Sequence, residues 1–448
     1  MTMLRTQRRR VLAGAGATAL LALAACSGEA GAEESSGGAE EITLWLAGGD
    51  TPQALRDHLT ETFEAEHPGT RLVIEEQDWS GLVPRLQTAL ASEDQTPDVV
   101  EIGNTQAPTF SYAGAFADLT ELSEELGGED LLPGFVEAGT ADGSVYALPY
   151  YAGSRAVFYR KDHFAAAGVE VPRTLEEFGD AAVALQAANP SGEEGYSGFW
   201  FPGQDWYNGI AWVFSSGGDL AVQEGGTWRG ALAEPEAQAG LAQVQRLFAE
   251  GTSAPRDADS EEPWVPFNNG QAAMFSAPTW ARWSIDLPEC NQGVAADDES
   301  EEAKALLAEQ QACNEEKTGV FPLPGPQEGT PATVFGGGSS IAVPALSQHQ
   351  DLAQDLLRIV FDDEYQTMLA ENGLIPGNTT FVDALGDDPY AAAAVAAALD
   401  AKPTPPAEKW ADVEGDRILE DFFQQIATGT DPAAAAAEAD RLLTRTLG

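Results

Sequence analysis

An alternation of strand and helix patterns between residues 42 and 102 constrains the fold of this 448-residue chain most strongly. Runs rich in Val, Ile and Leu indicate strands, and between them apolar residues recur every four positions, as on one face of a helix. The strands are expected at 42–46, 71–75 and 98–102, and the helices at the positions of Leu55, Leu59 and Phe63 and of Leu82, Leu86 and Leu90. This βαβαβ order is typical of a parallel sheet covered by helices on both faces. The sequence therefore predicts an α/β fold.

Later segments continue the mixture of strands and helices. Two short strand-like runs are expected at 145–149 and 156–160, with the segment 150–155 between them. A helix is expected to begin at Thr174, which forms a capping box with Glu177. Further predicted elements are a strand at 339–343, a helix marked by Leu352, Leu356 and Val360, and a helical C-terminal region from residue 408 with a break near Gly429.

The first 25 residues have the features of an export signal. Four arginines precede an apolar run from residue 11 to residue 25, which is shorter than the roughly 20 residues of an ordinary membrane span. The run ends in Leu23-Ala24-Ala25-Cys26, which matches the lipobox of exported lipoproteins and predicts lipidation of Cys26. The arginines also resemble a twin-arginine signal, so the general secretory and twin-arginine routes both stay open. Residues 26–40 are rich in Gly, Ser, Glu and Ala and are expected to form a flexible tether of about 20 Å.

The charge of the chain excludes two classes of partner. Acidic residues number 72 against 23 basic ones, for a net charge of −49, which becomes −53 when the four arginines of the signal are removed. Nucleic acid and anionic lipid surfaces both need a basic footprint, so neither is expected to bind. The same charge favours neutral over acidic ligands, unless Arg155 and Arg282 reverse the field locally.

Cys290 and Cys313 are the two thiols that remain besides Cys26. In an exported protein an isolated pair is more often a disulfide than a metal site, and we expect a disulfide here. The four histidines lie far from these thiols in the sequence and show no ligand spacing, so no metal site is predicted.

The residues that follow the first three strands are candidates for ligand contacts. In open α/β sheets ligands bind outside the carboxyl ends of the strands, and here these ends carry 48–50, 77–79 and 103–106. Their amides, carboxylates and indole suit a neutral polyhydroxylated ligand, because planar polar groups pair with hydroxyls and an aromatic ring covers a sugar's apolar face. Asp50 and Asn104 are equally plausible as turn or helix N-cap residues, while Trp45 and Trp212 are expected in the core.

Nucleotide binding is not supported by any motif. No Gly-x-Gly-x-x-Gly follows a strand, and no Gly-Lys-Ser/Thr loop is present. The Gly336-Gly337-Gly338 run precedes a strand instead of a helix, so it lacks the geometry of a phosphate cradle. No cofactor is predicted.

Several segments together resemble the extracellular solute-binding proteins of carbohydrate ABC importers, the family that includes maltose-type and chitobiose-type binders. They span nearly the whole chain after the tether and follow the family's order. The matching segments are 96–103 with 114–119, 145–150 with 158–162, 267–274 with Trp280, 336–343 and 372–376.

The resemblance implies a two-lobed, type II periplasmic-binding-protein-like α/β fold with the ligand between the lobes. The N-terminal lobe is expected to comprise 41–151 and 320–375, and the C-terminal lobe 152–319 and 376–448. Carried over position by position, the ligand-binding residues are expected to be Asp50, Asp78, Trp79, Asn104, Gln106, Tyr151, Arg155, Trp206, Trp280, Gly337, Gly338 and Trp410.

The function implied by the resemblance is that of a monomeric, lipid-anchored receptor on the outer face of the cytoplasmic membrane. It would bind a neutral di- or oligosaccharide and deliver it to an ABC permease without performing chemistry. The segments 101–106 and 334–339 favour chitobiose-type sugars, with cello- and malto-oligosaccharides close behind.

Two alternatives stay open at this point. A ferric-ion receptor on the same scaffold would use the adjacent phenols Tyr150 and Tyr151 as ligands. A lipid-anchored glycosidase would use two carboxylates, whose separation the sequence does not reveal.

Overall fold

The computed structural model describes residues 40–259, 262–294, 300–386, 389–399 and 401–448. The predicted signal peptide at 1–25, the predicted lipidation site Cys26 and the predicted tether up to residue 39 lie outside the described residues. Within the described ranges, no helix combines the length and the apolar character that crossing a bilayer requires.

The strands are mostly short. They are β1 Glu40–Ala47, β2 Thr70–Gln77, β3 Val99–Gly103, β4 Thr140–Ala141, β5 Ser144–Val145, β6 Leu148–Arg160, β7 Ser197–Phe199, β8 Ala221–Glu224, β9 Thr227–Gly230, β10 Ala272–Pro278, β11 Thr318–Phe321, β12 Gly336–Ala342 and β13 Ile375–Pro376. The first three strands agree with the predicted ones to within two residues at each end.

Helices connect and cover these strands. In the first half of the chain they are α1 Gln53–Glu66, α2 Leu82–Ala89, α3 Ala107–Tyr112, α4 Thr120–Glu125, α5 Pro133–Gly139, α6 Lys161–Ala167, α7 Leu175–Ala188 and α8 Trp206–Ser215. In the second half they are α9 Pro235–Arg246, α10 Trp264–Asn268, α11 Glu301–Lys317, α12 Gln350–Val360, α13 Asp363–Glu371, α14 Pro389–Leu399, α15 Trp410–Gly415, α16 Ile418–Ala427 and α17 Pro432–Leu447. Short 3₁₀ helices include η1 Trp79–Gly81, η2 Gly128–Asp130, η4 Thr279–Ser284 and η5 Thr379–Leu385, and the π-helical η3 Leu247–Gly251 continues α9.

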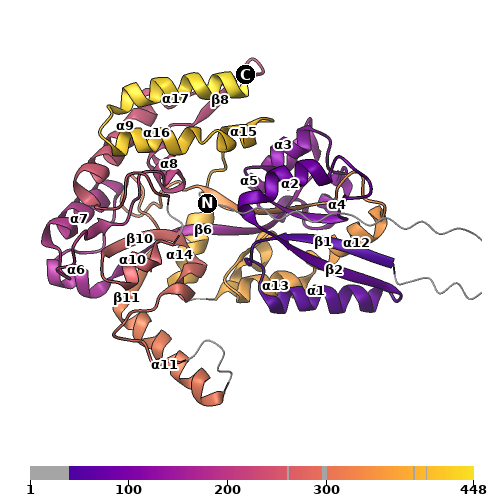
Figure 1. Ribbon diagram of the computed structural model, residues 1–448, viewed down its shortest axis with the longest axis horizontal. Helices are drawn as coiled ribbons and strands as arrows, with labels where there is room; N and C mark the ends of the chain where they lie inside the picture. Colours follow the sequence, from indigo (N-terminus) through magenta and orange to yellow (C-terminus); the bar gives the residue numbers. More distant parts are fainter. Residues whose placement is uncertain (1–39, 260–261, 295–299, 387–388, 400) are drawn as a thin grey trace, which may run out of the picture. The chain divides into compact units, whose positions relative to one another are not determined.

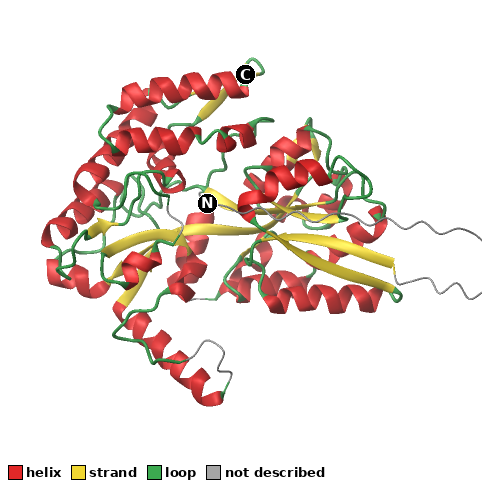
Figure 2. Cartoon of the chain, viewed as in Figure 1, coloured by secondary structure: helices red, strands yellow, loops and turns green. Residues whose placement is uncertain are grey.

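Nine of the described strands form one sheet (Figure 2). Its main order is β2-β1-β3-β12-β6-β10-β7, and β11 and β13 also pair with β6. Strand β1 is parallel to both β2 and β3, as the βαβαβ pattern predicts. Strand β12 is inserted antiparallel between β3 and β6, so a segment from late in the chain joins the sheet beside its first strands.

Strand β1 is buried on both faces, as parallel sheets require. Successive side chains of a strand point to opposite faces, and here the alternation separates two apolar clusters. Leu44 and Leu46 pack with α1, α12 and α13 on one face, while Trp45 and Ala47 pack with α2 and α3 on the other. Figure 1 shows α1 running alongside β1 and β2. The prediction that Trp45 belongs to the core is confirmed.

A larger apolar cluster lies around the second half of β6. It contains buried residues of α7, α8, α9, α16 and α17, among them Trp212. Phe321 and Phe335, which follow β6 by more than 150 positions, belong to this cluster as well. Helices α16 and α17 pack side by side near the C-terminus (Figure 1). Trp212 is almost fully buried, as predicted.

Strand β6 departs from the prediction of two short strands separated by the segment 150–155. It is a single strand of 13 residues. The first half pairs with β12 and β13, and the second half pairs with β10 and β11. Gly153 interrupts the local apolar pattern, but it pairs with Gly337, a partner far away in the sequence. The continuity of the strand therefore depends on long-range hydrogen bonds that local periodicity does not reveal.

The predicted disulfide is present. Cys290 and Cys313 are joined, and Cys313 lies on α11, the helix that extends away from the sheet in Figure 1. Asn314 adds two hydrogen bonds to the same contact: it donates to the carbonyl of Ile285 and accepts from the amide of Leu287. The helix is thus held against the segment 285–290 by a covalent and a polar link.

Two predicted helix boundaries, the start at Thr174 and the break near Gly429, are confirmed with small differences. The Thr174 side chain accepts from the amide of Glu177, whereas the Glu177 carboxylate accepts from the amide of Arg173, one residue earlier than in a standard capping box. The C-terminal helical region contains the break expected near Gly429. It also breaks at Arg417, whose φ of 55° lies in the left-handed region.

Candidate functional site

A cavity of about 240 Å³ lies where the carboxyl ends of β1, β2 and β3 face β6, β10 and β12. This is the place at which open α/β sheets bind ligands. The strand-end loops contribute Asp50, Trp79, Gly103, Asn104, Thr105 and Gln106. The remaining lining residues are Tyr151, Gly153, Arg155, Tyr207, Pro278, Trp280, Phe335, Gly337, Gly338 and Ser339.

Asp50 and Trp79 form a pair at the cavity wall. The indole Nε1 of Trp79 donates to Asp50 Oδ2 at 2.9 Å. Gly48 makes this contact possible, because its φ is +58° and an added Cβ would lie 2.8 Å from Trp79 Nε1. Desolvation in the cavity raises the pKa of Asp50, although the residue keeps exposed surface, and the hydrogen bond from Trp79 opposes the shift.

Arg56 of α1 holds the turn that carries Asp50. Its guanidinium donates to the carbonyls of Thr51 and Gly48 at 2.8 and 3.1 Å. It also pairs with Glu76 Oε2 at 3.0 Å. The turn after β1 is therefore tied to both the following helix and the neighbouring strand, which fixes the position of the Asp50 carboxylate.

Asn104 and Gln106 both follow β3, but their side chains differ in hydrogen bonding. Asn104 is buried, and its side-chain amide donates to the carbonyl of Gly336 at 2.6 Å, so it joins the end of β3 to β12. From the sequence, Asn104 could be a turn residue, a helix N-cap or a ligand contact. In the structure its side-chain amide connects β3 to β12 by the hydrogen bond to Gly336. Gln106 lies close to Gly103, and its Oε1 is a buried atom with no hydrogen-bond partner among the described residues.

Glu101 lies directly beneath the cavity. It is fully buried, accepts from the hydroxyl of Tyr151 at 2.8 Å and accepts from the amide of Ala47 at 2.8 Å. Desolvation raises its pKa to about 7, and the hydrogen bonds from Ser339, Ala47 and Tyr151 limit the shift. Tyr151 and Ser339 both line the cavity, so Glu101 supports two wall residues without lining it itself.

Aromatic side chains from other segments complete the wall. The ring centroids of Tyr207 and Phe335 are 4.9 Å apart, and Tyr207 stacks on Trp206 at 3.9 Å. The Arg155 guanidinium lies 5.6 Å from the Tyr207 ring centroid, within the range of a cation–π contact, and donates to the carbonyl of Ser276. Trp280 meets Trp264 edge to face at 5.7 Å.

A second buried carboxyl approaches the cavity from α15. Burial raises the pKa of Glu414 to about 7, and hydrogen bonds from Thr105, Trp410 and Gln106 oppose the shift. Trp410 itself has no exposed surface and donates to Glu414 Oε1 at 3.1 Å. Through Glu414, α15 contacts the loop that follows β3.

The structure brings together most of the residues predicted to bind ligand. Lining the cavity are Asp50, Trp79, Asn104, Gln106, Tyr151, Arg155, Trp280, Gly337 and Gly338. Three predicted residues do not line it: Asp78 is exposed next to Trp79, Trp206 is buried behind Tyr207, and Trp410 is packed in the core. Sequence reasoning missed Gly153, Tyr207, Pro278, Phe335 and Ser339. The adjacency of Tyr207 to Trp206 was the one available signal, but it does not tell which of the two rings faces the cavity.

The two phenols that a ferric-ion receptor would use, Tyr150 and Tyr151, form hydrogen bonds with other side chains of the protein. Tyr150 shares hydrogen bonds with Thr51 at 3.0 Å and with Tyr365 at 2.5 Å, and Tyr151 donates to Glu101. Desolvation raises the pKa of both phenols above the ordinary value of 10. Across the described residues, no three His, Cys, Asp or Glu side chains are grouped so as to hold a metal ion.

Comparison with known proteins agrees with this geometry. Residues 48–367 match the family model described as bacterial extracellular solute-binding protein. The chain is 31% identical over 444 residues to the diacetylchitobiose binding protein DasA of Streptomyces coelicolor, covering 97% of each chain. The solved structure of the sugar-binding protein MalE from Xanthomonas citri matches with a TM-score of 0.74 at 21% identity, covering 91% of this chain and 97% of that chain.

A second solved structure has the same fold. The GacH receptor of Streptomyces glaucescens matches with a TM-score of 0.72 at 20% identity, covering 91% of this chain and 98% of that chain. These likenesses confirm the predicted two-lobed α/β fold. The family match extends over more than half of the chain, and the relative matches along almost all of it. The chain therefore belongs to the bacterial extracellular solute-binding protein family.

Proposed function

We propose that the protein is a receptor that binds a neutral oligosaccharide in the cavity between β3, β6 and β12 and delivers it to an ABC permease. The proposal rests on Gln106 Oε1, a buried acceptor that has no hydrogen-bond partner among the described residues. The Gln106 side chain and the indole of Trp79 both lie next to Gly103. A buried acceptor without a partner is costly, and a hydroxyl or amide N–H of a ligand would satisfy it. The neighbouring indole supplies the apolar face on which a sugar ring stacks.

Other residues that line the cavity support the same ligand class. Trp280 offers a second aromatic surface, Asp50 an acceptor, and Arg155 a donor. A cavity that combines aromatic side chains with polar groups is typical of small-ligand sites, where the polar groups fix the orientation of the ligand. The volume of about 240 Å³ is slightly below the usual range of roughly 300 to 1,000 Å³, which favours a short saccharide.

A β-linked N-acetylglucosamine disaccharide is the substrate that we favour. The relative named for diacetylchitobiose aligns over nearly the whole chain at 31% identity. An acetamido group carries one N–H donor, which the unpartnered Gln106 Oε1 would accept. Malto- and cello-oligosaccharides are the comparison ligands for a test.

Binding without catalysis is part of the proposal. A glycosidase needs two carboxyl groups flanking the scissile bond. Among the described residues that line the cavity, Asp50 alone is acidic, and the nearby Glu101 is bonded to Tyr151 and Ala47 below the wall. Relatives with the same architecture are solute-binding proteins.

The remaining features of the proposed receptor rest on the sequence. We infer attachment to the outer face of the cytoplasmic membrane through a lipid on Cys26, a monomeric state, and lobes at 41–151 with 320–375 and at 152–319 with 376–448. Mass spectrometry of the membrane-extracted protein would test the lipid, since an unmodified Cys26 would contradict the anchoring.

Titration calorimetry of the purified protein tests the ligand class. Diacetylchitobiose, cellobiose and maltose are titrated separately, and a micromolar Kd, which corresponds to about −8 kcal/mol, is expected for at least the first. Reducing-sugar release is followed in the same samples. The absence of heat and of a thermal shift with every sugar would overturn the receptor proposal, and release of reducing sugar would overturn the non-catalytic role.

A further inference from the structure

Glu414 joins α15 to the loop that follows β3. Its carboxyl accepts hydrogen bonds from the side chains of Thr105 and Gln106, and its Oε1 accepts from Trp410 Nε1 at 3.1 Å. Thr105 and Gln106 line the cavity between β3, β6 and β12, here called the ligand cavity. Glu414 is not among the lining residues. It therefore contacts two residues of the ligand cavity without facing the cavity itself.

Other contacts hold α15 beside this loop. The backbone amide of Ala411 donates to Thr109 Oγ1 at 3.4 Å, and Thr109 belongs to α3, the helix that begins directly after Gln106. Trp410, at the start of α15, has no exposed surface and belongs to the large apolar cluster. The position of the Glu414 carboxyl relative to Gln106 is thus fixed by packing on one side and by α3 on the other.

The backbone of Gln106 is held by the turn at the end of β3. Its amide donates to the carbonyl of Gly103 at 3.0 Å, and its carbonyl accepts from the amide of Thr109 at 3.1 Å. Gln106 is the N-cap residue of α3, but its side chain makes no capping hydrogen bond. The side-chain amide is therefore free to serve Glu414 with one end and the ligand cavity with the other.

The contact with Glu414 sets the direction of the Gln106 amide. A carboxylate offers acceptors only, whereas a glutamine amide has a donating nitrogen at one end and an accepting oxygen at the other. The nitrogen must therefore face Glu414, which leaves Oε1 as the buried acceptor without a partner among the described residues. With no acceptor at position 414, the amide could turn over and present its N–H groups instead.

The carboxyl of Glu414 is ionised at mildly alkaline pH. Burial raises its pKa to about 7, and the charge of Glu420 on α16 acts in the same direction. Above that pH the group is a carboxylate, and hydrogen bonds to a charged group are roughly twice as strong as those between neutral groups. A ligand that donates to Gln106 Oε1 would polarise the amide and strengthen its N–H bond to Glu414. Ligand binding and the Glu414 contact should therefore support each other.

We propose that Glu414 is a positioning residue, which holds the Gln106 amide with its oxygen toward the ligand cavity and so makes the site select a ligand with a hydrogen-bond donor at this point. The inference rests on the proposed receptor function and adds the residue that sets the polarity of its acceptor. With the lobe boundaries inferred above, Glu414 comes from the C-terminal lobe and Gln106 from the N-terminal lobe.

A double-mutant cycle measured by calorimetry tests this role. Full-length wild type, Gln106→Ala, Glu414→Ala and the double variant are titrated at pH 8 with diacetylchitobiose, cellobiose and maltose. The cycle is built on the sugar that wild type binds most tightly. Glu414→Gln is a second variant, because it keeps the size of the side chain and one acceptor oxygen, and it replaces Glu414→Ala in the cycle if that variant does not fold. Thermal unfolding of each variant shows whether the fold is retained.

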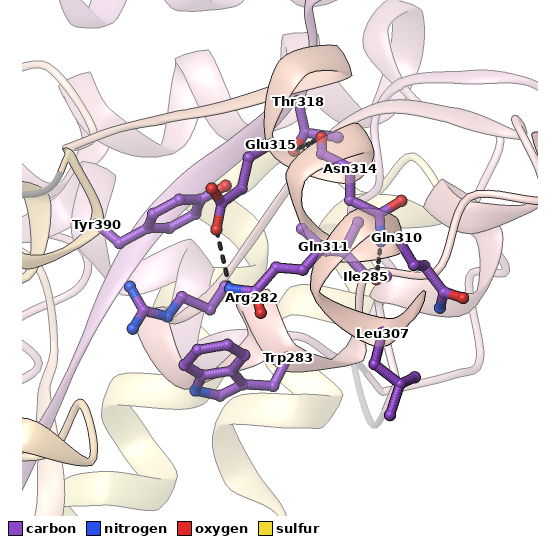
Figure 3. Close-up of a pocket in the computed structure, with 10 residues that line it drawn as sticks. All are labelled: Arg282, Trp283, Ile285, Leu307, Gln310, Gln311, Asn314, Glu315, Thr318 and Tyr390. Carbon is purple, nitrogen blue, oxygen red and sulfur yellow. Dashed lines mark hydrogen bonds between the residues drawn. The ribbon is translucent and has the colours of Figure 1, made fainter. Parts of the chain in front are cut away.

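Gln311 and Glu315 on α11 provide a matched control pair (Figure 3). Gln311 donates to Glu315 Oε1 at 3.0 Å. Both residues line a surface cavity of about 160 Å³ that has no lining residue in common with the ligand cavity. The same cycle with Gln311→Ala and Glu315→Ala therefore removes an equivalent glutamine–carboxylate contact away from the proposed ligand.

We expect Gln106→Ala and Glu414→Ala each to raise the Kd about two- to tenfold. The double variant should bind within about twofold of Gln106→Ala, because Glu414 acts through Gln106 and the two losses do not add. Glu414→Gln should fall between wild type and Glu414→Ala, and the control cycle should leave the Kd within about twofold of wild type.

Two results would overturn the positioning role while the receptor proposal stands. One is an unchanged Kd in a folded Gln106→Ala or Glu414 variant. The other is a double variant whose loss of affinity equals the product of the two single losses. Failure of wild type to bind any of the three sugars would overturn the receptor function itself.

Discussion

The hydroxyl of Tyr151 donates to Glu101 Oε1 at 2.8 Å, and the two residues join the wall of the ligand cavity to a fully buried carboxyl below it. Glu101 has an ordinary pKa of 4.5, which burial raises to about 7. Between these two values the folded protein keeps a proton that the unfolded chain has lost. The free energy of unfolding therefore decreases as pH rises from about 4.5 to about 7 and levels off above that range.

We predict that Glu101→Gln weakens this pH dependence. Glutamine resembles the protonated acid, with one oxygen to accept from Ala47 and an amide to donate to Tyr151 or Ser339. Urea unfolding at pH 5, 6, 7 and 8 should show a smaller loss of stability with pH in the variant than in wild type. Glu414 has a pKa raised to about 7 as well, so part of the dependence should remain until Glu414→Gln is added. Identical pH profiles of wild type and Glu101→Gln would contradict the assignment.

Substitution of Gln106 tests whether its Oε1 atom accepts a hydrogen bond from the ligand. Gln106→Ala removes Oε1 and should raise the Kd for the best disaccharide about two- to tenfold, the usual range for one neutral hydrogen bond. Gln95→Ala, an exposed glutamine after α2 and outside the cavity, serves as the control. If both variants bind like wild type in calorimetry, Gln106 does not contact the ligand.

Gly48 and Gly49 form a matched pair for testing the turn after β1. An alanine at Gly48 would have φ near +58°, and its Cβ would lie 2.8 Å from Trp79 Nε1, so Trp79 must move. We expect Gly48→Ala to lose about 1 kcal/mol or more of stability and to weaken sugar binding. Gly49 has nothing within 4 Å of an added Cβ, and Gly49→Ala should resemble wild type in both measurements. Equal behaviour of the two variants would show that the turn does not control Trp79.

Substitution of Trp79 and of Trp410 should distinguish an aromatic ring that contacts the ligand from one that stabilises the fold. Trp79→Ala removes an aromatic surface from the cavity and should raise the Kd about tenfold with a modest change in melting temperature. Trp410 has no exposed surface, so Trp410→Ala should destabilise the fold by about 3 to 5 kcal/mol. Calorimetry and denaturant unfolding on the same preparations measure both effects. A stable Trp410→Ala protein with impaired binding would reverse the assignment.

The sequence by itself determined the first part of the fold and one side of the site. The four-residue spacing of Leu55, Leu59 and Phe63 marks a helix face, and all three side chains are buried as that pattern predicts. Because the carboxyl ends of parallel strands meet at one edge of a sheet, the loops after β1, β2 and β3 could be expected to supply Asp50, Trp79 and Gln106 to one cavity. These conclusions need only local periodicity and the geometry of a βαβ unit.

The tertiary structure alone decided the opposite side of the site. Tyr207, Phe335 and Ser339 reach the cavity because β12 inserts beside β3 and Tyr207 of α8 packs against Phe335, and both contacts join segments more than 100 residues apart. Local pattern likewise could not tell that Tyr207 faces the cavity while its neighbour Trp206 is buried, or that Trp410 lies in the core. Aromatic side chains suit a core and a sugar site equally well, since both environments cover apolar surface. Which role each ring takes depends on the segment that packs against it, and that partner is fixed by long-range contacts.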